Sequence, residues 1–122
     1  MGWDLETPEG GCLSVNAWNW RPTLSLLEEA RVLDPETACL LGFNGGTTLT
    51  GADASRIAAF LDDYLGGLPE RGRVRLDGEV TEEPDDHRFH RDDLALNYSA
   101  TASWLRDLRD FCRAAPNGFT CM

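Results

Sequence analysis

The residues best suited to chemistry lie together in one acidic tract, which reads E-V-T-E-E-P-D-D-H-R-F-H-R-D-D from Glu79 to Asp93. The tract holds both histidines of the chain, His87 and His90, and its net charge of −5 is half the −10 of the whole chain. Imidazole nitrogens and carboxylate oxygens bind first-row divalent metals, so a metal site is one hypothesis for this tract. The carboxylates close enough in sequence to complete it are Asp85, Asp86, Asp92 and Asp93.

The spacing of the two histidines does not match a zinc-protease motif. His87 and His90 are three residues apart, whereas H-E-x-x-H separates its histidines by four and places a glutamate after the first. Pro84 and the dense charge instead favour an exposed loop, in which Arg88 and Arg91 pair with nearby carboxylates and Phe89 serves as an anchor. The main interpretation is therefore an exposed acidic loop, which could also dock a partner, and the metal site is the alternative.

A second candidate group is the segment Trp18-Asn19-Trp20-Arg21. If this segment is extended, its two indoles point to the same side, because alternate residues of a strand share a face. Trp and Arg dominate the hot spots of protein interfaces, so Trp18, Trp20 and Arg21 are candidate partner-binding residues. The alternative is that both indoles pack in the core and Arg21 pairs with a carboxylate.

Other kinds of site find little support in the sequence. The four cysteines lack the spacing of a zinc half-site, and we expect Cys39 and Cys112 to be reduced and buried in apolar helical segments. The segment at 44–48, N-G-G-T-T, lacks the Gly-Lys-Ser/Thr ending of a phosphate-binding loop, and the chain contains no lysine. We therefore predict no catalytic residue, no cofactor beyond a possible divalent metal, and a protein that is more readily understood as a non-enzyme.

The segment from Val15 to Pro22, V-N-A-W-N-W-R-P, resembles the start of small uncharacterised bacterial proteins of about this length. In those proteins V-N-x-W-x-W-R-P opens the domain and an F-C…G-F ending closes it, here Phe111-Cys112 and Gly118-Phe119. The resemblance extends from about residue 12 to residue 121. It carries no established activity, so it implies only a single small domain of a bacterial cytoplasmic protein.

The hydrophobic pattern predicts the elements that position these residues. Helices are expected at about 22–33 and 35–41, from the Thr50 cap to Gly66-Gly67, and after a Ser99 cap. Strands are expected at 13–17, at 119–121, and in a hairpin around Asp77-Gly78, with residues 1–11 as a loose lead-in. The predicted fold is a single α+β domain over residues 1–122, with three or four helices packed on a small, mostly antiparallel sheet.

Charge and hydropathy narrow the function. No apolar run reaches the length of a membrane span and no secretory signal is evident, so we expect a cytoplasmic protein. The net charge of −10 argues against nucleic acid or an anionic membrane as partner and suits a basic protein. The leading hypothesis is a small acidic protein-interaction domain, with an immunity-type inhibitor of a basic toxin as one form. Its predicted contact residues are Trp18, Trp20, Arg21, Asp85, Asp86, Phe89, Asp92 and Asp93.

Overall fold

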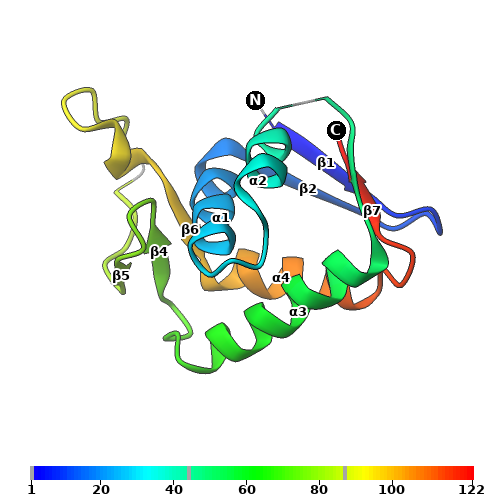
Figure 1. The fold of residues 1–122 in the computed structure, drawn as a ribbon. Coiled ribbons are helices and arrows are strands. Elements are labelled where there is room, and N and C mark those ends of the chain that lie inside the picture. Colours follow the sequence, from blue (N-terminus) through cyan, green and yellow to red (C-terminus); the bar gives the residue numbers. More distant parts are fainter. Residues whose placement is uncertain (1, 44, 87) are drawn as a thin grey trace.

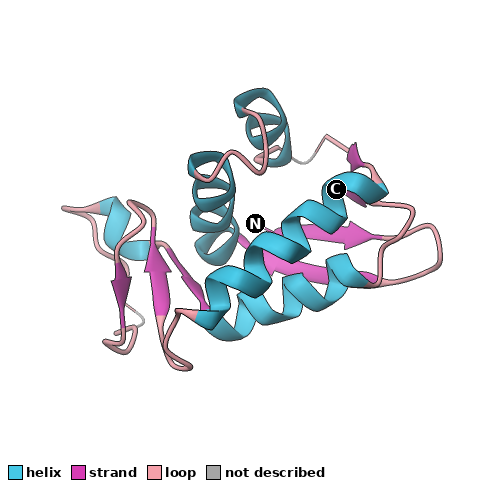
Figure 2. Ribbon diagram, turned by 60° about the horizontal axis from the view of Figure 1, so that its bottom comes forward, coloured by secondary structure: helices cyan, strands magenta, loops and turns pink. Residues whose placement is uncertain are grey.

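The computed structural model describes residues 2–43, 45–86 and 88–122. Within these ranges it contains four α-helices and two antiparallel sheets, which confirms the predicted α+β class (Figure 1). The difference from the prediction is that the strands form two separate sheets. The larger sheet and the helices make up most of the molecule, and the smaller sheet lies at one end (Figures 1 and 2).

The larger sheet has the strand order β2-β1-β7-β3, with antiparallel pairing throughout. Its strands are β1 (Gly2–Glu6), β2 (Cys12–Asn16), β3 (Thr47–Leu49) and β7 (Phe119–Cys121). Strand β1 corrects the expectation of a loose lead-in over residues 1–11, because it occupies an interior position of the sheet. Trp3 and Leu5 are buried while Asp4 and Glu6 are exposed, so this short segment has the two-residue alternation of a half-buried strand.

The four helices are α1 (Ala17–Glu29), α2 (Pro35–Leu41), α3 (Gly51–Gly66) and α4 (Ala102–Arg113). Two of them begin where the sequence predicts, because their caps are local. The Thr37 backbone N–H donates to Asp34 Oδ1 over 2.7 Å at the start of α2. Thr50 and Asp53 form a reciprocal capping box at the start of α3.

The starts of the other two helices differ from the prediction. Helix α1 begins at Ala17 and not near Pro22, because Asn16 caps it by accepting the Asn19 backbone N–H over 3.0 Å. Pro22 therefore lies inside the helix. Helix α4 is capped by Thr101, whereas the expected cap, Ser99, belongs to strand β6 (Ser99–Thr101).

The smaller sheet has the order β5-β4-β6 and contains the predicted hairpin. Strand β4 (Arg73–Arg75) turns through Asp77-Gly78 into β5 (Val80–Thr81), which forms the start of the acidic tract, and the rest of the tract follows β5. A single 3₁₀ turn, η1 (Leu94–Asn97), then leads into β6. Figure 1 shows the end of the tract and η1, in yellow, projecting beyond this sheet at the end of the molecule away from β1, β2 and β7.

The core lies between the larger sheet and the helices, with α3 and α4 packed along each other (Figure 2). Its largest fully buried side chains include those of Trp20, Phe119, Leu5, Leu61 and Leu105. The Trp20 and Trp104 rings meet edge to face with their centroids 6.3 Å apart. None of the helices in the described ranges is long and apolar enough to cross a membrane.

Candidate functional site

The acidic tract begins with β5 and continues from Glu82 to Asp93 as an exposed loop that leads to η1, as the main interpretation predicts. The side chains of all four candidate aspartates are open to solvent: Asp85, Asp86, Asp92 and Asp93. Asp93 also caps η1, because its Oδ1 accepts the Ala95 backbone N–H over 3.2 Å. His87 lies outside the described residues.

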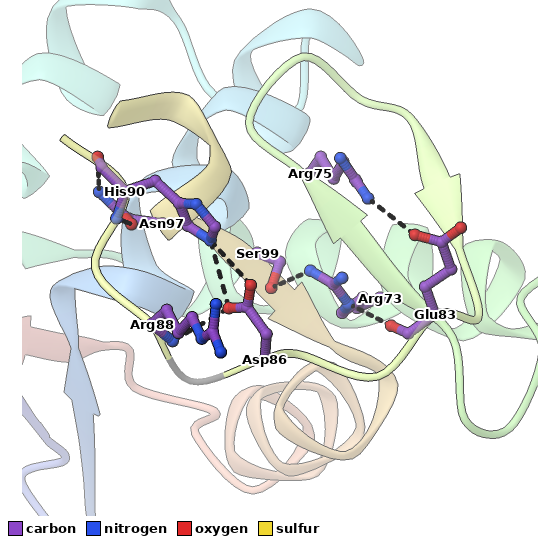
Figure 3. Close-up of polar contacts among 8 residues, drawn as sticks. All are labelled: Arg73, Arg75, Glu83, Asp86, Arg88, His90, Asn97 and Ser99. Carbon is purple, nitrogen blue, oxygen red and sulfur yellow. Dashed lines mark hydrogen bonds and ion pairs between the residues drawn. The ribbon is translucent and has the colours of Figure 1, made fainter. Parts of the chain in front are cut away.

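Two arginines of β4 hold the start of this loop (Figure 3). Arg73 donates through Nε to the Glu83 carbonyl over 2.7 Å and through Nη1 to Ser99 Oγ over 3.2 Å. Arg75 Nη2 lies 3.6 Å from Glu83 Oε2. Arg73 and Arg75 are two positions apart in the strand and therefore lie on the same face of the small sheet. The loop passes over this face.

The far side of the loop is held by Asn97. Its Oδ1 accepts the His90 backbone N–H over 2.7 Å, and its Nδ2 donates to the His90 carbonyl over 3.1 Å (Figure 3). His90 Nε2 in turn lies 3.1 Å from Asp86 Oδ2. The pKa of Asp86 is lowered, first by the backbone N–H of Arg88 and then by His90, so this carboxylate is ionised at neutral pH.

An aromatic cluster of Trp18, Phe89 and Tyr98 joins the loop to helix α1. The centroid of the Trp18 ring lies 6.3 Å from that of Phe89, at an interplanar angle of 64°, and 5.2 Å from that of Tyr98. The guanidinium carbon of Arg21 lies 6.0 Å from the Tyr98 ring centroid. Trp18 and Phe89 are still 42% and 61% exposed, so the cluster anchors the loop and also presents an apolar surface.

The two tryptophans of the W-x-W segment do not share a face, which corrects both sequence interpretations. In a helix, residues two positions apart point to nearly opposite sides. Trp18 therefore faces outward, whereas Trp20 is buried and donates through Nε1 to the Leu41 carbonyl over 2.9 Å. An extended segment would place the two indoles on one face, but Asn16 caps a helix here, and the helix turns them apart.

The metal hypothesis gains no support from the described residues. Among them, no group of three or more His, Cys, Asp or Glu side chains is placed to hold a metal ion. His90 has one described carboxylate partner, Asp86, and the role of His87 stays a prediction. The cysteine prediction was half right: Cys112 is buried, but Cys39 is exposed.

A small cavity of about 220 Å³ lies where the loop meets the aromatic cluster. Its walls are formed by Trp18, Asp85, Arg88, Phe89 and Asn97. A wider groove of about 470 Å³ begins on the other side of Arg21 and Tyr98 and runs between α1 and α2. Asn97 and Tyr98 are not among the site residues predicted from the sequence. Their one signal is a polar amide and an aromatic placed directly before the predicted Ser99 cap.

We found no match to this chain among protein-family models, curated proteins or solved structures.

Proposed function

We propose that this protein is a small interaction domain that binds a basic protein partner through one surface. This acidic–aromatic surface consists of Trp18, Asp85, Asp86, Phe89, Asp92 and Asp93. The observation that carries the proposal is that exposed carboxylates flank Phe89 on the anchored loop, and that Phe89 contacts the exposed Trp18 of helix α1. Trp20 is left out of the surface because it is buried in the core.

The two kinds of residue in this surface would act at different stages of binding. A local excess of negative charge attracts a cationic surface over distances of about a Debye length and speeds association at low salt. Exposed aromatic side chains then supply most of the affinity, because they bury a large area at a small entropic cost. The partner would therefore be expected to carry arginine or lysine around an apolar spot.

The attachments of the loop favour binding by a surface that is already formed. The Arg73 side chain donates to the Glu83 carbonyl, and the Asn97 side chain holds the backbone of His90 through two hydrogen bonds. A loop fixed in this way loses less conformational entropy on binding than a free one. An immunity-type inhibitor that covers the basic surface of a toxin in the cytoplasm is the form of this function that the charge suits best.

The test is affinity capture from a lysate of the source organism with two matched variants of the same net charge. The first variant neutralises the loop: Asp85→Asn, Asp86→Asn, Asp92→Asn and Asp93→Asn. The control neutralises four exposed carboxylates elsewhere: Glu9→Gln, Glu29→Gln, Asp63→Asn and Asp107→Asn. Both change the net charge from −10 to −6.

We expect the wild type and the control to capture the same basic protein and the loop variant to lose it. With that partner purified, its association rate at low salt should fall about tenfold or more for the loop variant. Equal capture by all three proteins, or a captured partner that is not basic, would contradict the proposal.

Elemental analysis of untagged protein checks the metal alternative: a stoichiometric transition metal that is lost in His90→Ala would favour it.

A further inference from the structure

The cavity beside Trp18 has the composition of a receptor for a single organic cation. Trp18 and Phe89 both line it, and their rings meet edge to face at an interplanar angle of 64°, so part of each ring stays exposed beside the contact. The Asp85 side chain lines the same cavity. Aromatic faces attract guanidinium and ammonium groups within about 6 Å of the ring centroid, and a carboxylate adds a full opposite charge.

The molecule already contains one interaction of this kind at the rim of the cluster. The guanidinium carbon of Arg21 lies 6.0 Å from the Tyr98 ring centroid, and Tyr98 contacts Trp18. One aromatic ring is therefore engaged by an arginine of the chain itself. Trp18 and Phe89 are the more exposed members of the cluster, and they line the cavity.

We infer that this cavity binds the guanidinium of an arginine side chain from the partner. The inference rests on the proposed function and makes it more specific, because it places one partner residue at one position. The volume of about 220 Å³ is too small for a drug-sized ligand, for which sites begin at about 300 Å³. The cavity suits the planar guanidinium of one arginine side chain, which can stack on Trp18 while it donates hydrogen bonds to the Asp85 carboxylate.

One residue of the cavity opposes this binding, which gives the inference a test with a definite sign. Arg88 also lines the cavity, and its positive charge repels an incoming guanidinium. The Arg88 backbone N–H donates to Asp86 Oδ1 over 3.0 Å, and this bond does not depend on the side chain. Arg88→Gln should therefore keep the turn and strengthen cation binding.

The experiment is a titration of the full chain with Nα-acetyl-arginine amide, followed by NMR of the tryptophan indole N–H groups. Trp18 is the exposed indole among the four tryptophans, since Trp3, Trp20 and Trp104 are each at most 8% exposed. We expect the Trp18 signal to move with a dissociation constant of the order of millimolar, while the three buried indoles stay fixed. The neutral isostere Nα-acetyl-citrulline amide should cause little change.

Variants locate the site. Asp85→Asn and Phe89→Leu should each weaken binding about fivefold, Arg88→Gln should strengthen it, and the distant Asp63→Asn should leave it unchanged. An unmoved Trp18 signal at about 20 mM arginine amide, or equal shifts with the citrulline compound, would overturn the inference. Because the titration needs no partner protein, its failure beside a successful capture would refute the cation pocket and leave the interaction function standing.

Discussion

At the scale of single residues, the hydroxyl of Thr23 joins helix α1 to helix α4 inside the core. It donates to the Asn19 carbonyl over 2.8 Å and accepts from Trp104 Nε1 over 2.9 Å. Thr23 is fully buried and its bond with Trp104 is buried too, so the indole N–H cannot exchange this bond for water. Because the Trp104 ring meets the Trp20 ring edge to face, the hydroxyl helps to fix the packing of both indoles.

Replacing the Thr23 hydroxyl by a methyl group should therefore lower the unfolding free energy, although the size of the side chain hardly changes. Thr23→Val keeps the shape of the side chain but leaves the Trp104 indole N–H buried without an acceptor, so we expect a loss of about 1–3 kcal/mol of unfolding free energy. Urea denaturation measures this loss. The control is Thr48→Val. The exposed Thr48 hydroxyl pairs with Thr120 in the sheet, and water can replace this bond for Thr120. The control should therefore lose less than about 0.5 kcal/mol of unfolding free energy. Equal losses in both variants would show that the Thr23 bonds contribute no special stability.

At the scale of elements, the parts predicted well are those whose signals are local. Helices α2 and α3 carry their caps in sequence, Asp34-Pro35 and Thr50 with Asp53, and the β4–β5 hairpin carries its turn in Asp77-Gly78. Strand β6 was missed because its pairing with β4 joins distant segments, and a serine next to a helix is also a common cap. The prediction of a helix at about 22–33 starts and ends too late: Pro22 suits a first turn, but here it lies inside a helix that ends at Glu29.

The start of helix α3 shows a second non-local constraint. A Cβ added to Gly51 would lie 2.0 Å from the Pro116 carbonyl oxygen, in the turn that precedes β7. This approach joins two backbone segments that are far apart in sequence, and only glycine leaves room for it. The other end of the same helix has no such contact, because a Cβ on Gly66 would meet nothing within 4 Å.

These two glycines should respond to alanine in opposite directions. Gly51→Ala should lower the unfolding free energy by about 2 kcal/mol or more, because backbone must move to admit the methyl group. Gly66→Ala should raise it by about 0.4–1 kcal/mol, because alanine restricts the unfolded chain and favours the helix. Thermal and urea denaturation of the two variants test this difference, and a stable Gly51→Ala protein would contradict the close approach.

At the scale of the whole molecule, the charged loop could be predicted from the sequence, but the residues that contact it could not. The charges of the tract and the proline within it indicated an exposed segment. The contact of Phe89 with Trp18, and of Trp18 with Tyr98, joins positions up to 80 residues apart and depends on the complete fold. The same holds for the cysteines, whose exposure depends on which helix faces and which side of the larger sheet pack inward.

The reactivity of the four thiols measures which cysteines the fold buries. Cys12 and Cys39 are exposed, whereas Cys112 and Cys121 are buried, and burial raises their pKa values to about 12 and about 11. Because the thiolate is the reactive form, the buried pair should be inert in the folded protein at pH 8. We expect Ellman's reagent to modify Cys12 and Cys39 in the native protein, and the other two cysteines only in denaturant. Fast modification of Cys112 without denaturant would show that the core opens more readily than its packing implies.

The position of β7 between β1 and β3 also sets an order on folding during synthesis. The β1–β2 hairpin needs only residues 2–16, but among the strands of the described ranges β3 pairs with β7 alone, and β7 comprises residues 119–121. A chain still emerging from the ribosome therefore carries β3 and one side of β1 without neighbours, and it exposes apolar side chains such as Leu49 and Leu5 that are buried in the finished fold. The larger sheet closes only after β7 has been made, so until residue 121 is available these apolar side chains are open to aggregation.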